Sequence, residues 1–251
     1  SPAELPPGMT SFKVQQFRWT KGGAQTTLKL LPRVLLSKQP LKIKIESFFH
    51  LTTFTMHLYM FLLILMMFPA MMLRTNVFGD ESGWRIAFDM SVLTLATMSG
   101  SIYYMVGQRE TRRGWIGKLK YLPMLMALGV GLSVSNVKAV MEALFGKKSE
   151  FVATPKFGDA VGQDRKALIR DKARGRRDLL PYIELLMGFY MLACCVWAVV
   201  HHTLAAMAFP FFGTFAFGFF WVSVMSFQEQ YAKRRVPRTT GVPAEVTISK
   251  D

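Results

Sequence analysis

The stretch FFHLTTFTMHLYMFLLILMMFPAMML (48–73) decides the fold of this 251-residue chain, and it contains no Lys, Arg, Asp or Glu. A transmembrane helix needs about 20 consecutive, mainly apolar residues, because the hydrocarbon core of a bilayer is about 30 Å thick. A helix on the surface of a soluble domain would instead carry polar residues on its outer face. We therefore predict a membrane-spanning helix over 48–73.

Apolar residues elsewhere also come in blocks, and hydrophobic residues make up 51% of the sequence. We predict further spans at about 86–106, 181–202 and 204–226. The span over 86–106 contains Asp89 and several hydroxyl residues, so we expect it to face protein or a polar cavity. The predicted fold class is all-α, an integral membrane helical bundle of about four full transmembrane helices.

Basic residues set the predicted orientation. The net charge is +15, and Lys and Arg cluster beside the apolar blocks. This pattern fits the positive-inside rule and contact with anionic lipid headgroups better than it fits nucleic-acid binding. Segments 107–120, 146–178 and 228–238 are rich in Lys and Arg, which places them in the cytosol and loop 74–85 outside. We predict a multi-pass protein of the inner or plasma membrane with a cytosolic C-terminus.

Segment 119–146 lies between two predicted cytosolic flanks, which a single crossing cannot join. We therefore predict a short bent hairpin, a re-entrant pair of half-helices or an interfacial helix. Gly129, Gly131 and Ser133 lie near its middle. Broken backbone at membrane depth is tolerated where it is buried in protein or lines a cavity, so this segment is a candidate channel wall. A plain crossing, with one flank assigned to the wrong side, is the alternative.

Segment 24–47 has the pattern of an amphipathic helix that lies in the membrane interface. Leu28, Leu31 and Leu35 share one helical face, and basic residues share another. Pro32 is expected to kink this helix. The Pro-rich residues 1–14 are expected to be irregular.

No complete catalytic site is visible in the sequence, which lacks a phosphate-binding glycine loop, a nucleophile elbow and a Cys/His cluster. Cys194 and Cys195 are adjacent within an apolar segment, where we interpret them as packing or membrane-facing residues. The adjacent His201 and His202 are interpreted as interfacial residues. We assign no catalytic residue and no metal site to this chain.

Two short motifs carry possible chemistry. QQFRW (15–19) combines amides, a guanidinium and a large aromatic ring directly ahead of the membrane helices. A guanidinium suits bidentate contacts with phosphate, and an exposed indole suits stacking on a sugar ring. In FVATPK (151–156), the Thr154 hydroxyl and the Lys156 cation lie on a basic loop. Taken alone, the first motif also fits an interfacial Trp-Arg anchor, and the second fits a solvated loop.

The order of these features resembles the C-terminal half of processive family 2 glycosyltransferases, whose members include cellulose synthases and cellulose-synthase-like mannan and glucomannan synthases. That order is Q-x-x-R-W, an amphipathic helix, two spans, a bent segment, F-x-x-T-x-K and two further spans. The resemblance covers essentially the whole chain, and ELP…QQ-x-RW-x-KG looks closer to the mannan-synthase-like, bacterial branch. Ala153 stands where the second motif of cellulose synthases, F-x-V-T-x-K, has Val.

The resemblance implies a role for each motif residue. Trp19 would stack on the terminal sugar of the acceptor glycan at the mouth of a channel. Gln15 and Arg18 would contact the nucleotide-sugar donor or its diphosphate. A gating loop over the bound nucleotide would be formed by Phe151, Thr154 and Lys156.

The family's metal-binding D-x-D and catalytic-base T-E-D motifs precede its Q-x-x-R-W, and they are missing from this sequence. We therefore expect a divalent cation, Mg or Mn, in a catalytic domain outside this chain, and none bound by the chain itself. The sequence opens SPAELPP without an initiator Met, so we interpret it as a fragment or processed product that is inactive alone. Expected partners are a nucleotide-sugar donor, a glycan or lipid acceptor, membrane lipids and the catalytic domain, with no nucleic acid.

The predicted function is the membrane and channel portion of an inverting glycosyltransferase that extends a β-glycan and passes it across the membrane. Tyr103, Tyr104 and Trp84 are candidate aromatic liners of the polymer path. Two alternatives stay open. The spans could anchor a non-processive glycosyltransferase that acts on a lipid acceptor, or the chain could be a non-enzymatic transporter or scaffold whose motifs bind headgroups.

The predicted organisation follows the chain. It comprises the end of a cytosolic glycosyltransferase domain (1–23), the amphipathic interface helix (24–47), a transmembrane region (48–146), a cytosolic basic loop with the gating motif (147–180), two further transmembrane helices (181–226) and a cytosolic tail expected to be disordered (227–251).

Overall fold

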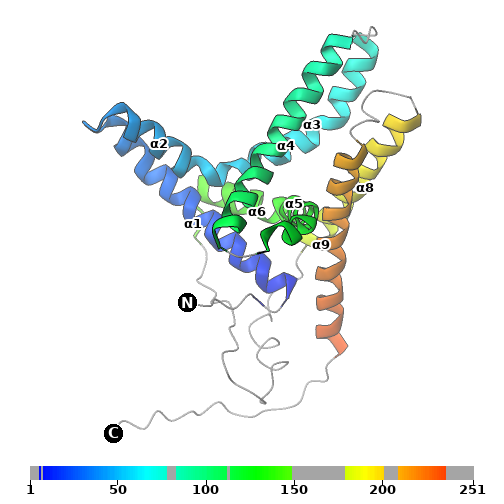
Figure 1. The fold of residues 1–251 in the computed structure, drawn as a ribbon. Coiled ribbons are helices and arrows are strands. Elements are labelled where there is room, and N and C mark those ends of the chain that lie inside the picture. Colours follow the sequence, from blue (N-terminus) through cyan, green and yellow to red (C-terminus); the bar gives the residue numbers. More distant parts are fainter. Residues whose placement is uncertain are drawn as a thin grey trace, which may run out of the picture.

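The computed structural model describes residues 6, 8–77, 83–111, 114–148, 179–200 and 209–235. All elements in these ranges are helical (Figure 1), which confirms the all-α prediction. In chain order they are α1 (Met9–Leu36), α2 (Leu41–Thr52), the 3-10 turn η1 (Thr53–Thr55), α3 (Met56–Val77), α4 (Gly83–Thr111), the 3-10 segment η2 (Trp115–Tyr121), α5 (Leu122–Gly131), α6 (Ser133–Leu144), α8 (Leu180–Val200) and α9 (Phe209–Arg235).

Three stretches of the described residues are long and apolar enough to cross a membrane, namely Leu41–Leu73, Leu180–Val200 and Phe211–Ala232. The bent pair α5–α6 adds a fourth if it is counted as one span. These helices confirm the predicted membrane bundle. The 29-residue α4 covers the predicted span 86–106, but it is not among these stretches.

Two element boundaries differ from the sequence prediction. Segment 24–47, predicted as one interface helix, divides between α1, which runs through Pro32 unbroken, and α2, which leads into the first span. The break falls at 37–40, because a proline at position 40 disfavours helical backbone in the residue before it. At the other end, α9 continues to Arg235, inside the segment 227–251 that the sequence predicts to be disordered.

The apolar core lies among α3, α8 and α9, with α5 and α6 packed against them. α8 and α9 run alongside each other (Figure 1) and form the most extensive helix contact of the described chain. Cys194 and Cys195 are free thiols buried in this core, which agrees with the packing role predicted for them.

A proline within α3 ties this helix to α8. Pro69 lacks an N–H, so the carbonyl of Leu65 loses its intrahelical partner. The Tyr190 hydroxyl on α8 donates to that carbonyl at 2.8 Å and accepts the N–H of Phe68 at 3.2 Å. Unpaired backbone groups are costly inside a bilayer, so Tyr190 stabilises the interrupted helix and joins it to its neighbour.

The predicted bent segment is present as α5 and α6, which meet at Leu132 with a bend of 44°. At this angle the chain continues past the bend and does not double back as a hairpin.

α5 crosses α9 at small residues. A Cβ on Gly218 would lie 2.1 Å from the carbonyl oxygen of Ala127, and one on Gly131 would lie 2.3 Å from the carbonyl oxygen of Gly218. Such close approach of two backbones requires glycine. The crossing brings the start of α6 into the bundle, where Val134 joins the core.

Candidate functional site on helix α1

Helix α1 carries the Q-x-x-R-W motif and has two different faces. Gln15, Arg18 and Trp19 are spaced i, i+3 and i+4, so they share one face of the helix. The buried residues also follow the helical repeat on the other side of α1, and Lys21, three residues after Arg18, lies at the edge of that side. The buried residues are Met9, Lys13, Thr20, Lys21, Ala24 and Thr27.

The motif face is open in this chain. The Trp19 side chain is 57% exposed, and Gln15 and Arg18 are half-buried. An exposed indole offers a flat apolar surface with one hydrogen-bond donor, which suits stacking on a sugar ring. The structure therefore places the three predicted residues on one side of α1, with Trp19 exposed and with Nε of Arg18 buried.

The N-terminus of α1 is held by α9. The carboxylate of Glu229 accepts hydrogen bonds from the backbone N–H groups of Met9 and Thr10, the second at 2.9 Å. The first N–H groups of a helix have no intrahelical partner, and a negative charge is favourable there. Glu229 thus caps α1 from another helix and fixes where α1 starts, within the segment 1–14 that the sequence predicts to be irregular.

One turn further along, Lys13 forms a buried ion pair. Its Nζ lies 2.5 Å from a carboxylate oxygen of Glu184 on α8 and donates to the hydroxyl of Ser226 on α9 at 2.7 Å. Lys13 is 5% exposed and Glu184 is fully buried. The sequence pattern did not predict this pair, although one signal was present, because an acid within an apolar span marks a buried polar contact.

A second lysine holds α1 to α6 beyond the motif. The Nζ of Lys21 lies 2.8 Å from one carboxylate oxygen of Glu142, and the exposed Lys147 lies 3.6 Å from the other. Lys21 also lies over the ring of Phe17, 5.9 Å from its centroid. Next to this pair, Ala24 packs against Val140 and Ala143. The motif therefore lies between two lysine–glutamate pairs, the first buried and the second partly buried.

α6 also turns polar side chains towards α3. Ser133 and Asn136 are buried, and the Asn136 Nδ2 lies 3.3 Å from Nε2 of His57. Within the described part of the chain, Ser133 Oγ and Asn136 Oδ1 have no hydrogen-bond partner. Buried polar groups are as a rule hydrogen-bonded, so this layer suits water or a hydroxyl-rich ligand. The sequence pattern singled out Ser133 but neither Asn136 nor His57.

The predicted gating-loop residues Phe151, Thr154 and Lys156 lie outside the described residues, as do His201 and His202. Their roles stay predictions. The described residues contain no group of three His, Cys, Asp or Glu side chains that could hold a metal ion.

Two of the three predicted aromatic liners are described. Tyr103 and Tyr104 on α4 are 77% and 43% exposed, and their rings meet edge to face at 5.7 Å. The side chain of Trp84 lies outside the description. The lining role of all three residues stays a prediction.

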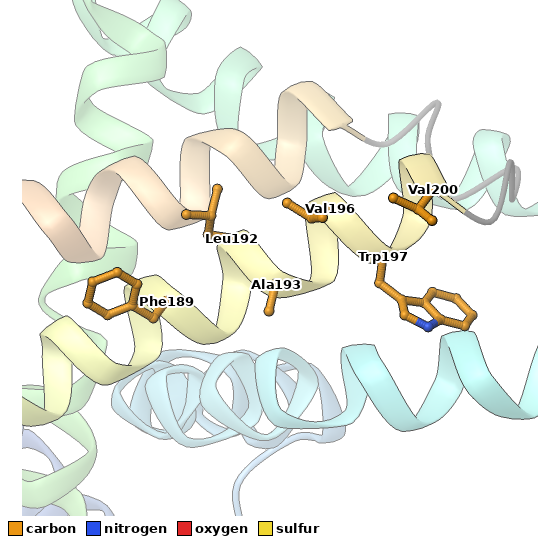
Figure 2. Close-up of a pocket in the computed structure, with 6 residues that line it drawn as sticks. All are labelled: Phe189, Leu192, Ala193, Val196, Trp197 and Val200. Atoms are coloured by element: carbon orange, nitrogen blue, oxygen red, sulfur yellow. The ribbon is translucent and has the colours of Figure 1, made fainter.

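An apolar hollow lies along α8, with a volume of about 520 Å³. In Figure 2, Ala193 and Trp197 point towards α3, and Leu192, Val196 and Val200 point away from it. The Trp197 ring meets Phe68 edge to face at 5.8 Å. Recognition of a sugar needs several placed polar groups, which this lining lacks, so the hollow suits acyl chains or another apolar helix. Its lining residues are Phe189, Leu192, Ala193, Val196, Trp197 and Val200.

No family model and no solved structure match the chain. Among curated proteins, it is 26% identical over 209 residues to glucomannan 4-beta-mannosyltransferase 7 of Arabidopsis thaliana, covering 79% of this chain and 34% of that protein. It is 27% identical over 202 residues to probable glucomannan 4-beta-mannosyltransferase 15 of the same plant, covering 76% and 33%. Probable glucomannan 4-beta-mannosyltransferase 11 is 25% identical, with 79% and 42% covered. The chain thus spans about a third of the length of the first two relatives.

These similarities support the resemblance to cellulose-synthase-like family 2 glycosyltransferases and hence a glycosyltransferase function. They do not support the bacterial branch that the residues around Q-x-x-R-W favour, because the relatives are plant proteins.

Proposed function

We propose that the chain is the membrane portion of an inverting family 2 glycosyltransferase. The full-length protein would transfer a sugar from a nucleotide-diphosphate donor to a growing β-glycan and pass the polymer across the membrane. One observation carries the proposal, namely the two-faced helix α1. Its motif side chains share an open face, while its opposite face is fixed to α6, α8 and α9 by buried polar contacts.

The open face carries side chains of the right chemistry. The planar guanidinium of Arg18 would bind diphosphate oxygens, and the exposed indole of Trp19 would stack on the acceptor sugar. The Gln15 amide, one turn before Trp19, offers both a donor and an acceptor to the nucleotide sugar. These residues bind and orient the reactants, so their contribution is proximity and stabilisation of charge on the leaving diphosphate.

The base and the divalent cation of such a reaction belong, in this proposal, to a catalytic domain outside the chain. The described residues do not fit a Mg or Mn site, because they contain no cluster of carboxylates or imidazoles. A general base there would take the proton of the acceptor hydroxyl. The chain supplies binding groups and the membrane path, and we expect it to be inactive alone.

The ends of the basic loop support its predicted gating role. Segment 149–178 follows α6 and precedes α8 in the sequence, and both helices contact α1 through ion pairs that lie near this segment in the sequence. Glu142 and Lys147 lie at the end of α6, and Glu184 lies near the start of α8. The F-x-x-T-x-K motif is therefore connected at both ends to helices that hold the motif helix, which suits a loop that closes over a nucleotide bound there.

The polar layer on α6 suits an adjoining polymer path. Ser133 and Asn136 present hydroxyl and amide groups next to the first span. A polysaccharide in a membrane needs such partners for its hydroxyl groups, because lipid offers none. We propose that the glycan passes from Trp19 towards this layer, with the motifs on the cytosolic face of the inner or plasma membrane.

Sugar transfer by the full-length protein in proteoliposomes tests the function. We expect labelled polymer from one of a panel of nucleotide-sugar donors, and loss of transfer in Trp19→Ala with normal membrane insertion. A single-sugar lipid product would replace the polymerase by the non-processive alternative. Absence of transfer with every donor, or transfer unchanged by Trp19→Ala, would contradict the proposal.

A further inference from the structure

We propose that the pairs Lys13–Glu184 and Lys21–Glu142 are positioning devices that set the rotation and the axial place of α1. In this role they aim Gln15, Arg18 and Trp19 at the donor and acceptor without touching either. The inference rests on the proposed function of the motif and names residues that the motif itself does not contain.

The placement of the two lysines carries the inference. Both are 5% exposed; Lys13 lies on the face of α1 opposite the motif, and Lys21, three residues after Arg18, lies at the border between the motif face and the buried face. Lys13 precedes the motif and pairs with α8, whereas Lys21 follows it and pairs with α6. A helix held at two points by partners on different helices can neither roll nor slide without breaking a pair.

Stability alone does not account for these contacts. A buried ion pair is often no more stabilising than a well-packed apolar pair of similar volume, because both charges lose their hydration. A single ion pair with a 2.5 Å or 2.8 Å separation nevertheless specifies one register, since a small slide leaves charges unpaired. Fixing a register is the best-attested use of buried polar groups.

α9 reinforces the first pair with two further polar contacts to α1. Ser226 accepts a hydrogen bond from Lys13, and Glu229, one turn further along α9, caps the first turn of α1. The cap adds a further limit on movement along the axis of α1, which the ion pairs also restrict. One residue of slip would move the motif by about 1.5 Å, and a misplacement of about 1 Å in an active site can lower a rate about a hundredfold.

The test replaces charges without removing packing. In the full-length protein, Lys13→Met with Glu184→Leu approximately keeps the side-chain volumes and removes both charges of the pair. We expect this double variant to insert and to unfold at an unchanged or higher temperature, while kcat/KM for the donor falls about tenfold or more. Lys29→Met, at an exposed position of the same helix, is the matched control and should leave kcat/KM unchanged.

A structural readout separates this inference from the proposed function. Spin labels at Gln25→Cys on α1 and Leu186→Cys on α8, with Cys194 and Cys195 replaced by Ala, report the distance between the helices. Both labelled positions are exposed. We expect a shifted or broadened distance distribution in the Lys13→Met/Glu184→Leu background only.

Each outcome has a distinct meaning. A folded double variant with unchanged distances and unchanged kcat/KM would overturn the positioning role. Wild-type protein that transfers no sugar would instead overturn the proposed function, and the distance measurement would still decide the positioning role. Partial recovery of activity when Glu184→Lys is added to Lys13→Glu would support positioning, because the exchange restores a pair in the same place.

Discussion

Helix α1 and the pair α8–α9 are held in place by different forces. α8 and α9 meet through apolar side chains such as Met187, Met191 and Phe219. α1 has smaller apolar contacts through Met9 and Ala24, to which a cap and two lysine–glutamate ion pairs are added. Apolar packing in a membrane gives close contact but discriminates weakly between neighbouring registers, because lipid is as apolar as the partner. Charged contacts specify a single arrangement. The part of the chain that carries the proposed binding motif is therefore the part held with the highest specificity.

The largest effect is expected when one partner of a buried ion pair is removed. Glu184→Leu alone leaves the buried Lys13 charge without its carboxylate, which should lower the free energy of unfolding by about 3–5 kcal/mol. Denaturant unfolding in detergent micelles measures this change. Adding Lys13→Met should restore most of the loss, and failure of the second substitution to do so would show that α1 depends on more than this pair.

A second prediction concerns the close packing of α5 against α9. Gly218→Ala would place a methyl group 2.1 Å from the carbonyl oxygen of Ala127, and such overpacking should cost about 1–3 kcal/mol. Gly213→Ala on the same helix has nothing within 4 Å and should be neutral or stabilising by up to about 1 kcal/mol. Thermal unfolding of both variants, followed by circular dichroism, compares them directly. Equal stability of the two variants would contradict the close crossing of α5 and α9.

A smaller effect is expected at the proline of α3. Tyr190→Phe removes the donor to the carbonyl of Leu65 and should lower stability by about 1 kcal/mol. In a Pro69→Ala background the carbonyl regains its intrahelical N–H, so the same substitution should have less effect. A double-mutant cycle of unfolding free energies measures the coupling between Tyr190 and Pro69. A coupling near zero would show that the Tyr190 hydroxyl does not compensate for the hydrogen bond lost at Pro69.

The smallest expected change in stability lies on the open face of α1. Trp19→Ala removes a side chain that is 57% exposed and should alter the free energy of unfolding by less than about 0.5 kcal/mol. The same variant is expected to lose sugar transfer. A large loss of stability would instead indicate that Trp19 is an interfacial anchor, as in the alternative reading of the motif.

The sequence predicts the membrane-spanning helices well. A long apolar run without charged residues, such as 48–73, has few stable alternatives to a membrane-spanning helix. It also predicts the bent segment, from the basic flanks on both sides of 119–146, but not the helix that gives Gln15, Arg18 and Trp19 a shared face. The contacts that hold α1 were not predictable in this way. Lys13 and Glu184 lie 171 residues apart in the sequence. Taken alone, Lys13 is interpreted as a solvated residue, and Glu184 as a charge without an identified partner.

The N-terminal boundary of α1 illustrates the same limit. A Pro- and Gly-containing start predicts irregular backbone, and the structure begins a helix at Met9 because Glu229 satisfies the first N–H groups. Local propensity is overridden here by a partner at the other end of the chain. The predicted gating residues and the tail beyond Arg235 lie outside the described residues, so their sequence predictions stand untested.

The cap at Glu229 also sets an order of events during synthesis. The capping carboxylate follows the start of α1 by 220 residues, and ribosomes add about 5–20 residues per second. The helix that bears the motif is therefore made before the spans but acquires its final anchor on the order of ten seconds or more later, when α9 enters the membrane. Completion of α1 therefore requires that α9 has already been made, so the proposed binding face is assembled only after the helices α3, α8 and α9 have been synthesised.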